Sequence, residues 1–255
     1  MKDEGAAVKQ LRRRAFTLGP SPFTVNPMRP VCIVMVKAPR AGAVKTRLVP
    51  PLTFEEAASL AACFARDTVS LARRAVGEVF VAYAPEGGRA PLEALLGGGA
   101  ARRVEQRGED LGARIESAAL EVFGRVRGPV VVLGTDSPTL PREFIESAVA
   151  SLSAGESDLA LGPTDDGGYY LVGLRRPFGG LFEGVAWSTP HVYARTAENA
   201  ARAGLRVLRL PRWFDVDTPE DLARLREEIL SGGPSGARAT RGWLLAHAAS
   251  PRGKL

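Results

Sequence analysis

The chain has 255 residues, of which 45% are hydrophobic and 24% charged, a composition typical of globular proteins. Its longest strongly apolar run, residues 31–36, is far shorter than the roughly 20 residues of a membrane-spanning helix, which argues against a membrane protein. The Arg-rich N-terminus has no apolar segment of the kind found in secretory signals. Cys32 and Cys63 lie in apolar segments without metal-site spacing. We therefore expect a cytoplasmic protein with two free, buried thiols.

The formal net charge of +6 belongs to the two ends of the chain. Residues 1–29 and residues 232–255 each contribute +4, whereas residues 30–231 carry −2. We expect a flexible basic extension over 1–29, with Met28 as an alternative start of translation, one domain over 30–231, and a basic, linker-like tail over 232–255. No nucleic-acid partner is expected, because only the tails are basic; a non-catalytic nucleic-acid binder is kept as a remote alternative.

Strand and helix patterns alternate between the tails. In chain order, the expected strands are 31–36, 78–84, 102–106, 129–134, 159–162, 169–174 and 206–210. The expected helices are 53–75, 91–96, 110–123, 141–152, 191–203 and 219–230, with a short one at 243–248. This order predicts an α/β fold with a largely parallel sheet covered on both faces. Ligands of such sheets collect at the carboxyl ends of the strands, so the loops there are the candidate site.

The loop after the first strand is rich in positive charge. Lys37 and Lys45 are the only lysines between residues 30 and 231, which otherwise use arginine, including Arg47 in the same loop. Backbone N–H groups around Gly42 and these cations suit a polyphosphate. The spacing differs from a P-loop because Gly42 precedes Lys45 by three residues. A solvated basic loop is the alternative.

Acidic residues follow two other elements. Asp136 stands just after the strand that ends at Gly134, which suits a divalent cation bound together with phosphate oxygens; a helix cap is the alternative. Asp215 and Asp217 alternate onto one side of an extended segment. Because helix capping explains neither of them, one is a reasonable second metal ligand.

Residues 165–170 join two strands through Asp166 and two glycines, which is either a plain tight turn or a site for a sugar or acceptor hydroxyl. Ser188 or Thr189 is expected to cap the helix that follows Trp187. His191, in the first turn of that helix, is interpreted as structural.

Taken together, these loops resemble a known bacterial family, DUF2064, whose members are small GT-A-like transferases related to the two-phospholactate guanylyltransferases. Some members are linked to arsenosugar biosynthesis. The resemblance covers residues 31–230 and neither tail. The matching segments are Lys37-x-Pro39-x-x-Gly42-x-Val44-Lys45-Thr46-Arg47-Leu48, Gln106-x-Gly108-x-Asp110-Leu111-Gly112, Gly134-Thr135-Asp136-Ser137-Pro138, Gly162-Pro163-x-x-Asp166-Gly167-Gly168-Tyr169-Tyr170-Leu171, Trp187-Ser188-Thr189 and Asp215-Val216-Asp217-Thr218.

The resemblance implies a three-layer nucleotide-diphospho-sugar transferase fold of the GT-A, Rossmann-like type, with a mixed, mainly parallel sheet. It also implies Mg²⁺ or Mn²⁺ held by Asp136 and Asp217. The expected catalytic residues are Lys45, Asp136 and Asp166. The expected nucleotide-binding residues are Lys37, Pro39, Gly42, Lys45, Thr46, Arg47, Gly134 and Asp136. The expected substrate-binding residues are Asp166, Gly167, Gly168, Tyr169, Trp187, Ser188 and Thr189.

The leading hypothesis is therefore a metal-dependent glycosyltransferase that moves a sugar from a nucleoside-diphosphate sugar to a small-molecule acceptor. The alternative is a guanylyl- or cytidylyltransferase that uses a nucleoside triphosphate, because the phosphate and metal contacts suit both reactions. A homodimer is one assembly compatible with the sequence.

Overall fold

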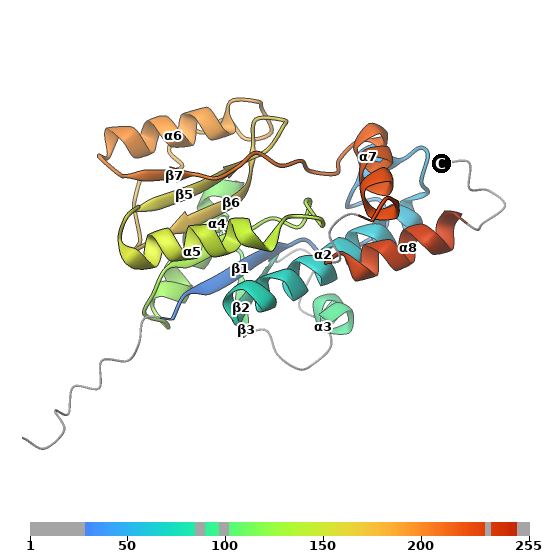
Figure 1. Ribbon diagram of the computed structural model, residues 1–255, viewed down its shortest axis with the longest axis horizontal. Helices are drawn as coiled ribbons and strands as arrows, with labels where there is room; N and C mark the ends of the chain where they lie inside the picture. The colour runs from blue at the N-terminus through green and yellow to red at the C-terminus, as the bar shows by residue number, and fades with distance from the viewer. Residues whose placement is uncertain (1–28, 85–89, 97–101, 233–235, 249–255) are drawn as a thin grey trace, which may run out of the picture.

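The computed structural model describes residues 29–84, 90–96, 102–232 and 236–248, which build one seven-stranded sheet with helices on both faces (Figure 1). The predicted N-terminal extension lies outside the described residues, apart from Arg29. The strand order is β3-β2-β1-β4-β6-β5-β7. The strands are β1 (Val31–Val36), β2 (Glu78–Tyr83), β3 (Arg102–Glu105), β4 (Val130–Leu133), β5 (Leu159–Pro163), β6 (Tyr169–Leu174) and β7 (Val207–Arg209).

One strand of this sheet, β6, runs antiparallel to its neighbours β4 and β5, and the other pairings are parallel. The prediction of a mixed, mainly parallel sheet is therefore confirmed. The chain builds outward from β1 to β3 and then returns to place β4 on the other side of β1. This reversal of strand order opens a crevice at the carboxyl ends of β1 and β4, where ligands of open α/β sheets bind.

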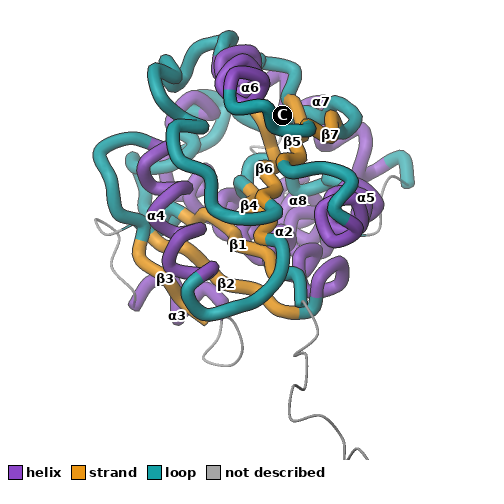
Figure 2. The backbone as a smooth tube through the Cα atoms, turned by 90° about the vertical axis from the view of Figure 1, so that its left-hand side faces the viewer, coloured by secondary structure: helices purple, strands orange, loops and turns teal. Residues whose placement is uncertain are grey.

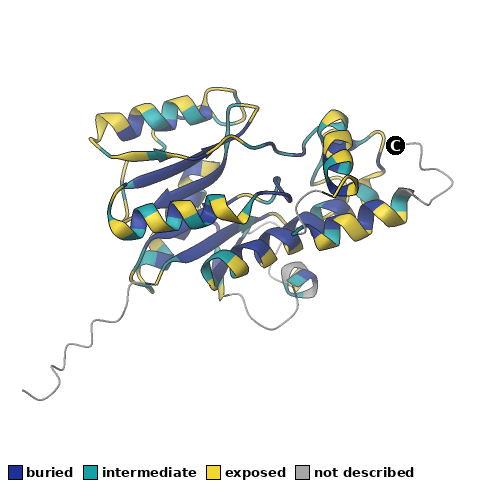
Figure 3. Ribbon diagram, viewed as in Figure 1, coloured by how far each residue is buried: buried dark blue, intermediate teal, exposed yellow. Residues whose placement is uncertain are grey.

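Two helical layers bury the two faces of the sheet (Figure 2). Side chains of α2 (Phe54–Val76), α3 (Ala90–Leu96) and α5 (Arg142–Ala154) pack on one face. Side chains of α4 (Leu111–Phe123) and α6 (Val192–Arg202) pack on the other. Figure 3 shows the consequence: the central strands are buried, the edge strands β3 and β7 are partly exposed, and the helices carry one buried and one exposed side.

A third apolar cluster lies at the end of the molecule that carries α7 (Pro219–Leu230) and α8 (Arg238–Ala248) (Figure 1). It joins them to the first half of α2 and to the short 3-10 helix η1 (Thr46–Leu48). The expectation of a linker-like tail from residue 232 is therefore wrong for residues 238–248. They form a helix that starts five residues before the predicted one, and its Trp243 and Leu244 are buried against α2 and α7.

The helix ends follow local capping chemistry where the sequence supplies it. Thr53 starts α2 and Thr218 starts α7, each in a reciprocal capping box. The predicted cap of α6 is wrong, because His191 is its N-cap residue and its side chain makes no capping hydrogen bond. No helix within the described ranges is long and apolar enough to cross a membrane.

Asp67, buried on α2, holds the start of α8. Its carboxylate accepts hydrogen bonds from the Ala239 and Thr240 backbone N–H groups, at 2.9 and 2.8 Å, and from the Thr240 hydroxyl at 2.7 Å. Asp67→Ala should lower the free energy of unfolding by about 2–3 kcal/mol, because it leaves donors of a helix N-terminus without their charged acceptor. Urea unfolding measures this, and a loss below about 0.5 kcal/mol would contradict it.

Candidate active site

A cavity of about 830 Å³ opens at the carboxyl ends of β1 and β4. It collects side chains from loops that are far apart in the sequence. The predicted site residues that line it are Lys37, Lys45, Arg47, Gly134, Asp136, Asp166, Gly168, Tyr169, Trp187, Ser188, Thr189 and Asp217. Four predicted residues do not line it, namely Pro39, Gly42, Thr46 and Gly167.

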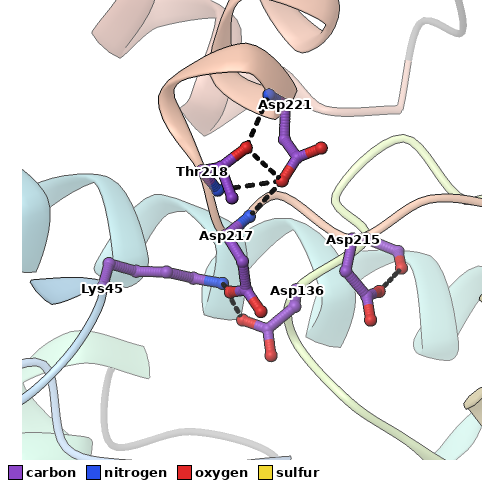
Figure 4. A network of polar contacts seen from close by, with 7 residues as sticks. Lys45, Asp136, Asp215, Asp217, Thr218 and Asp221 are labelled. Carbon is purple, nitrogen blue, oxygen red and sulfur yellow. Dashed lines mark hydrogen bonds and ion pairs between the residues drawn. The ribbon is translucent and has the colours of Figure 1, made fainter. Parts of the chain in front are cut away.

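At the centre of the site, one ammonium group lies between two carboxylates (Figure 4). The Lys45 Nζ is 2.8 Å from the Asp217 Oδ1 and is also ion-paired to Asp136. The Lys45 side chain is only 8% exposed, whereas those of Asp136 and Asp217 are 45% and 39% exposed. The two acids that the sequence suggested as metal ligands therefore converge on one positive charge.

Backbone contacts place these three side chains. Lys45 has the left-handed backbone conformation (φ 48°), which is costly for a residue with a Cβ and is typical of functional loops. The Asp136 carbonyl accepts a hydrogen bond from the Val216 N–H at 2.9 Å, which ties the loop after β4 to the segment before α7. The Asp217 N–H donates to the Asp221 carboxylate within the cap of α7. The carboxylates are thus held by two independent elements.

The ion pairs keep Lys45 charged. Burial by itself would lower the pKa of Lys45, but the charges and hydrogen bonds of Asp136 and Asp217 outweigh it and raise the pKa above its usual value. The site therefore carries a buried, permanent positive charge at neutral pH.

Asp215, two residues before Asp217, lies on the other side of Asp136 and accepts a hydrogen bond from the Ser137 hydroxyl (Figure 4). Burial, and secondly the negative charge of Asp136, raise the pKa of Asp215 to about 7. The sequence pattern left Asp215 and Asp217 as equal candidates for a metal ligand. The structure separates them, because Asp217 shares Lys45 with Asp136 and Asp215 does not.

The raised pKa of Asp215 predicts a pH-dependent stability. Its folded-state pKa exceeds its unfolded one, so its contribution is full below about pH 4 and is lost as the pH rises toward 7. Asp215→Asn, which keeps an acceptor for Ser137, should therefore stabilise the protein by on the order of 2 kcal/mol at pH 8 relative to pH 5. Unfolding free energies of both proteins at the two pH values test this; parallel pH profiles would contradict it.

Two other cations of the basic loop are exposed and unpaired. Lys37 and Arg47 line the cavity, and neither has a hydrogen-bond or ion-pair partner among the described residues. Gly42 lies between them with φ 73° and open space around it. Lys37 and Arg47 therefore present positive charge that no group in the described ranges neutralises, as an anion-binding loop requires.

The turn between β5 and β6 contributes Asp166. The Asp166 Oδ1 accepts hydrogen bonds from the Thr164 hydroxyl and from the Gly168 N–H, the latter at 3.0 Å, and Oδ2 has no partner in the described part of the chain. Gly167 has φ 90°, and a Cβ there would lie 2.1 Å from the Pro190 carbonyl oxygen. The close approach that this glycine permits fixes the turn against residues 187–190.

Aromatic rings line the same part of the cavity. The rings of Tyr169 and Trp187 meet edge to face with 6.3 Å between centroids. A Cβ at Gly112, in the first turn of α4, would lie 2.6 Å from the Trp187 ring, so this glycine lets the indole pack directly on the helix. Ser188, with φ 61°, is the second non-glycine residue in the left-handed region among those described.

Comparison with known proteins identifies the family. Residues 68–189 match the sequence model of the family DUF2064, which is described as "Uncharacterized protein conserved in bacteria". A crystal structure of a candidate nucleotide-diphospho-sugar transferase from Desulfovibrio desulfuricans G20 is 34% identical, with a TM-score of 0.77, over 87% of this chain and 95% of that one. The chain belongs to the DUF2064 family.

More distant solved structures share the fold of this DUF2064 protein. They include the inositol-1-phosphate CTP transferase from T. maritima, with 17% identity and a TM-score of 0.52 over 81% of this chain and 98% of that one. A cytidylyltransferase from Leptospira borgpetersenii serovar Hardjo-bovis (strain JB197) has 16% identity and a TM-score of 0.50 over 86% and 93%. No curated protein matches the chain. The predicted nucleotide-diphospho-sugar transferase fold is thus confirmed.

The potential metal ligands of this DUF2064 protein fit Mg²⁺ or Mn²⁺ in part. No group of three metal-ligating side chains is present within the described ranges. However, Asp136 and Asp217 converge on one cation, and Mg²⁺ typically takes one or two carboxylates, completing its shell with water and substrate phosphates. The residues therefore fit a metal that arrives with a phosphate ligand.

The segment around the start of α4 also lines the cavity, with Gln106, Glu109, Asp110, Leu111 and Arg114. In the sequence, this segment stands out only through the family resemblance, which gives it no role. Gln106 bridges the ends of β1 and β2 by donating to the Val36 and Ala82 carbonyls. Asp110 caps α4, and this places the first residues of the helix at the cavity. The spacing of glycine and aspartate at residues 108–112 is the sequence pattern that could have predicted this part of the site.

Proposed function

We propose that the protein is a metal-dependent glycosyltransferase that moves a sugar from a nucleoside-diphosphate sugar to a hydroxyl group of a small acceptor. One observation carries the proposal: Lys37 and Arg47, which have no partner among the described residues, and a lysine-bridged pair of carboxylates face one cavity at the strand-order reversal. The 34% identical candidate nucleotide-diphospho-sugar transferase supports this reaction class.

The basic loop binds the donor diphosphate. Lys37 and Arg47 supply positive charge that no group in the described part of the chain neutralises, and Ala43 and Val44 bring the backbone of the same loop to the cavity. Lys45 holds the carboxylates of Asp136 and Asp217 together before the donor arrives. This preorganisation lowers the cost of assembling a charged site.

Asp136 and Asp217 are the residues that would hold Mg²⁺ or Mn²⁺. When bound, the metal supplies Lewis-acid stabilisation of the negative charge on the diphosphate. Asp215 has no role in that set, because its carboxyl group is buried and hydrogen-bonded to Ser137.

The transfer forms a bond between the acceptor oxygen and the anomeric carbon of the sugar. The bond from that carbon to the diphosphate oxygen breaks, and the nucleoside diphosphate leaves with the electron pair. The Asp166 Oδ2 has no hydrogen-bond donor in the described part of the chain, so it is the group that accepts the acceptor proton. The proton then passes to solvent.

A ligand screen followed by a product assay tests this function. Nucleoside-diphosphate sugars with Mg²⁺ or Mn²⁺ should raise the thermal unfolding temperature, and a chelator should remove most of the shift. Release of a nucleoside diphosphate with a glycosylated product supports the proposal. Release of pyrophosphate from GTP or CTP with an acceptor would replace it with nucleotidyl transfer, the second reaction that this phosphate and metal chemistry allows.

A further inference from the structure

We propose that the acceptor is a hydroxyl compound without phosphate or carboxylate groups. This inference rests on the proposed function and concerns the part of the cavity lining that the donor loop does not supply. We call this part the acceptor wall: Glu109, Asp110, Leu111 and Arg114 at the start of α4, Asp166 and Tyr169 at the β5–β6 turn, and Trp187.

The first argument is charge. The wall carries three acids, Glu109, Asp110 and Asp166, and a single base, Arg114. Arg114 is already engaged, since its Nε donates to the Gly108 carbonyl at 3.0 Å. The other cations that line the cavity, Lys37, Lys45 and Arg47, all belong to the donor loop. An anionic acceptor would therefore meet net negative charge at the wall, and like charges at short range oppose binding.

The second argument is hydrogen bonding. Glu109 has no partner among the described residues, and the Asp166 Oδ2 accepts no hydrogen bond there. An ionised carboxylate has only acceptors, and both residues are exposed, so a ligand that displaces water from them must supply donors in its place. A hydroxyl group donates one, whereas a phosphate dianion or a carboxylate donates none. The wall thus favours a ligand with several hydroxyl groups.

The third argument is shape. Tyr169 and Trp187 form an edge-to-face pair, and Leu111 is 44% exposed beside them at the start of α4. These groups offer an apolar surface next to the carboxylates, as is typical of small-molecule sites with a few well-placed polar groups. A compound with hydroxyl groups on one side and a carbon skeleton on the other fits both features.

Paired compounds that differ only in charge test the inference. Glycerol and glycerol 3-phosphate form one pair, and glucose and glucose 6-phosphate a second. Transfer is measured as acceptor-dependent release of nucleoside diphosphate from the donor identified in the ligand screen. We expect kcat/KM at least tenfold higher for the uncharged member of a pair. The inference is overturned if the phosphorylated member is preferred. It is also overturned if both members are used equally or if neither is used.

Charge variants separate the wall from the donor loop. Glu109→Lys should shift the ratio of kcat/KM values at least tenfold toward the phosphorylated member. Asp166→Asn should reduce use of the uncharged member at least tenfold, whereas its neighbour Asp165→Asn, a surface partner of Arg224, should change it less than twofold. An unchanged ratio in Glu109→Lys contradicts the role of the wall.

The two proposals fail in different ways. Absence of any donor-dependent and metal-dependent thermal shift in the wild-type protein refutes the proposed function. A normal shift with a preference for phosphorylated acceptors leaves that function intact and overturns only the acceptor class.

Discussion

Asp136→Asn should reduce the rate of donor-dependent transfer by about a hundred- to a thousandfold, since metal and charge stabilisation at such sites contributes several kcal/mol. Asn keeps the size of the side chain but removes the charge that Lys45 and a metal both require. Stability should change little, because the side chain is 45% exposed and Asp217 remains to pair with Lys45. Steady-state kinetics across a Mg²⁺ or Mn²⁺ titration, together with thermal unfolding, measure the two effects separately.

Asp158→Asn is the matched control for this variant. Asp158 also bonds to a cation, with Arg206 at 3.0 Å, but it lies at the amino end of β5, away from the cavity. We expect it to leave both transfer and the metal titration unchanged. Full activity and an unaltered metal response in Asp136→Asn would exclude Asp136 as a metal ligand.

Lys45→Met should lower transfer by about a hundredfold and also alter stability. Met preserves the buried stem but leaves Asp136 and Asp217 facing each other without their shared cation. The repulsion between these two like charges should cost the variant about 1 kcal/mol of unfolding free energy at neutral pH, a modest loss because both groups are partly exposed and screened by solvent.

Chemical denaturation of Lys45→Met and of the wild-type protein at neutral pH provides the measurement. Lys45→Arg is the companion variant, since it restores the charge with a different shape and should recover stability more than activity. A Lys45→Met protein with wild-type transfer would remove Lys45 from the site.

The fold was predictable because its signals are local. Alternating strand and helix patterns and the capping boxes at Thr53 and Thr218 depend on neighbours a few residues apart. The start of α8 was missed for the opposite reason: its N-terminal N–H groups bond to Asp67, which is 172 residues away in the chain. A glycine- and serine-rich composition before the helix gave no sign of that contact.

The candidate site was predictable in its residue types and less so in their pairing. Lys45, Asp136 and Asp217 stand out because charged residues follow strands at the ligand-binding edge. Strand alternation put Asp215 and Asp217 on one side, but only tertiary packing buries Asp215 beside Ser137 and aims Asp217 at Lys45. The residues of the acceptor wall around the start of α4 had no predicted role, because their spacing reflects helix capping by Asp110 rather than a recognisable chemical motif.

The position of the lysine-bridged carboxylates between two apolar clusters has a mechanical consequence. Asp136 follows a strand of the sheet core, whereas Lys45 directly precedes η1 and Asp217 directly precedes the cap of α7, and both helices pack with α8 in the separate end cluster. A ligand that engages all three side chains therefore fastens the end cluster to the sheet. Donor binding should slow amide hydrogen exchange in α7 and α8, whose described residues contribute no side chain to the cavity, as well as in the basic loop.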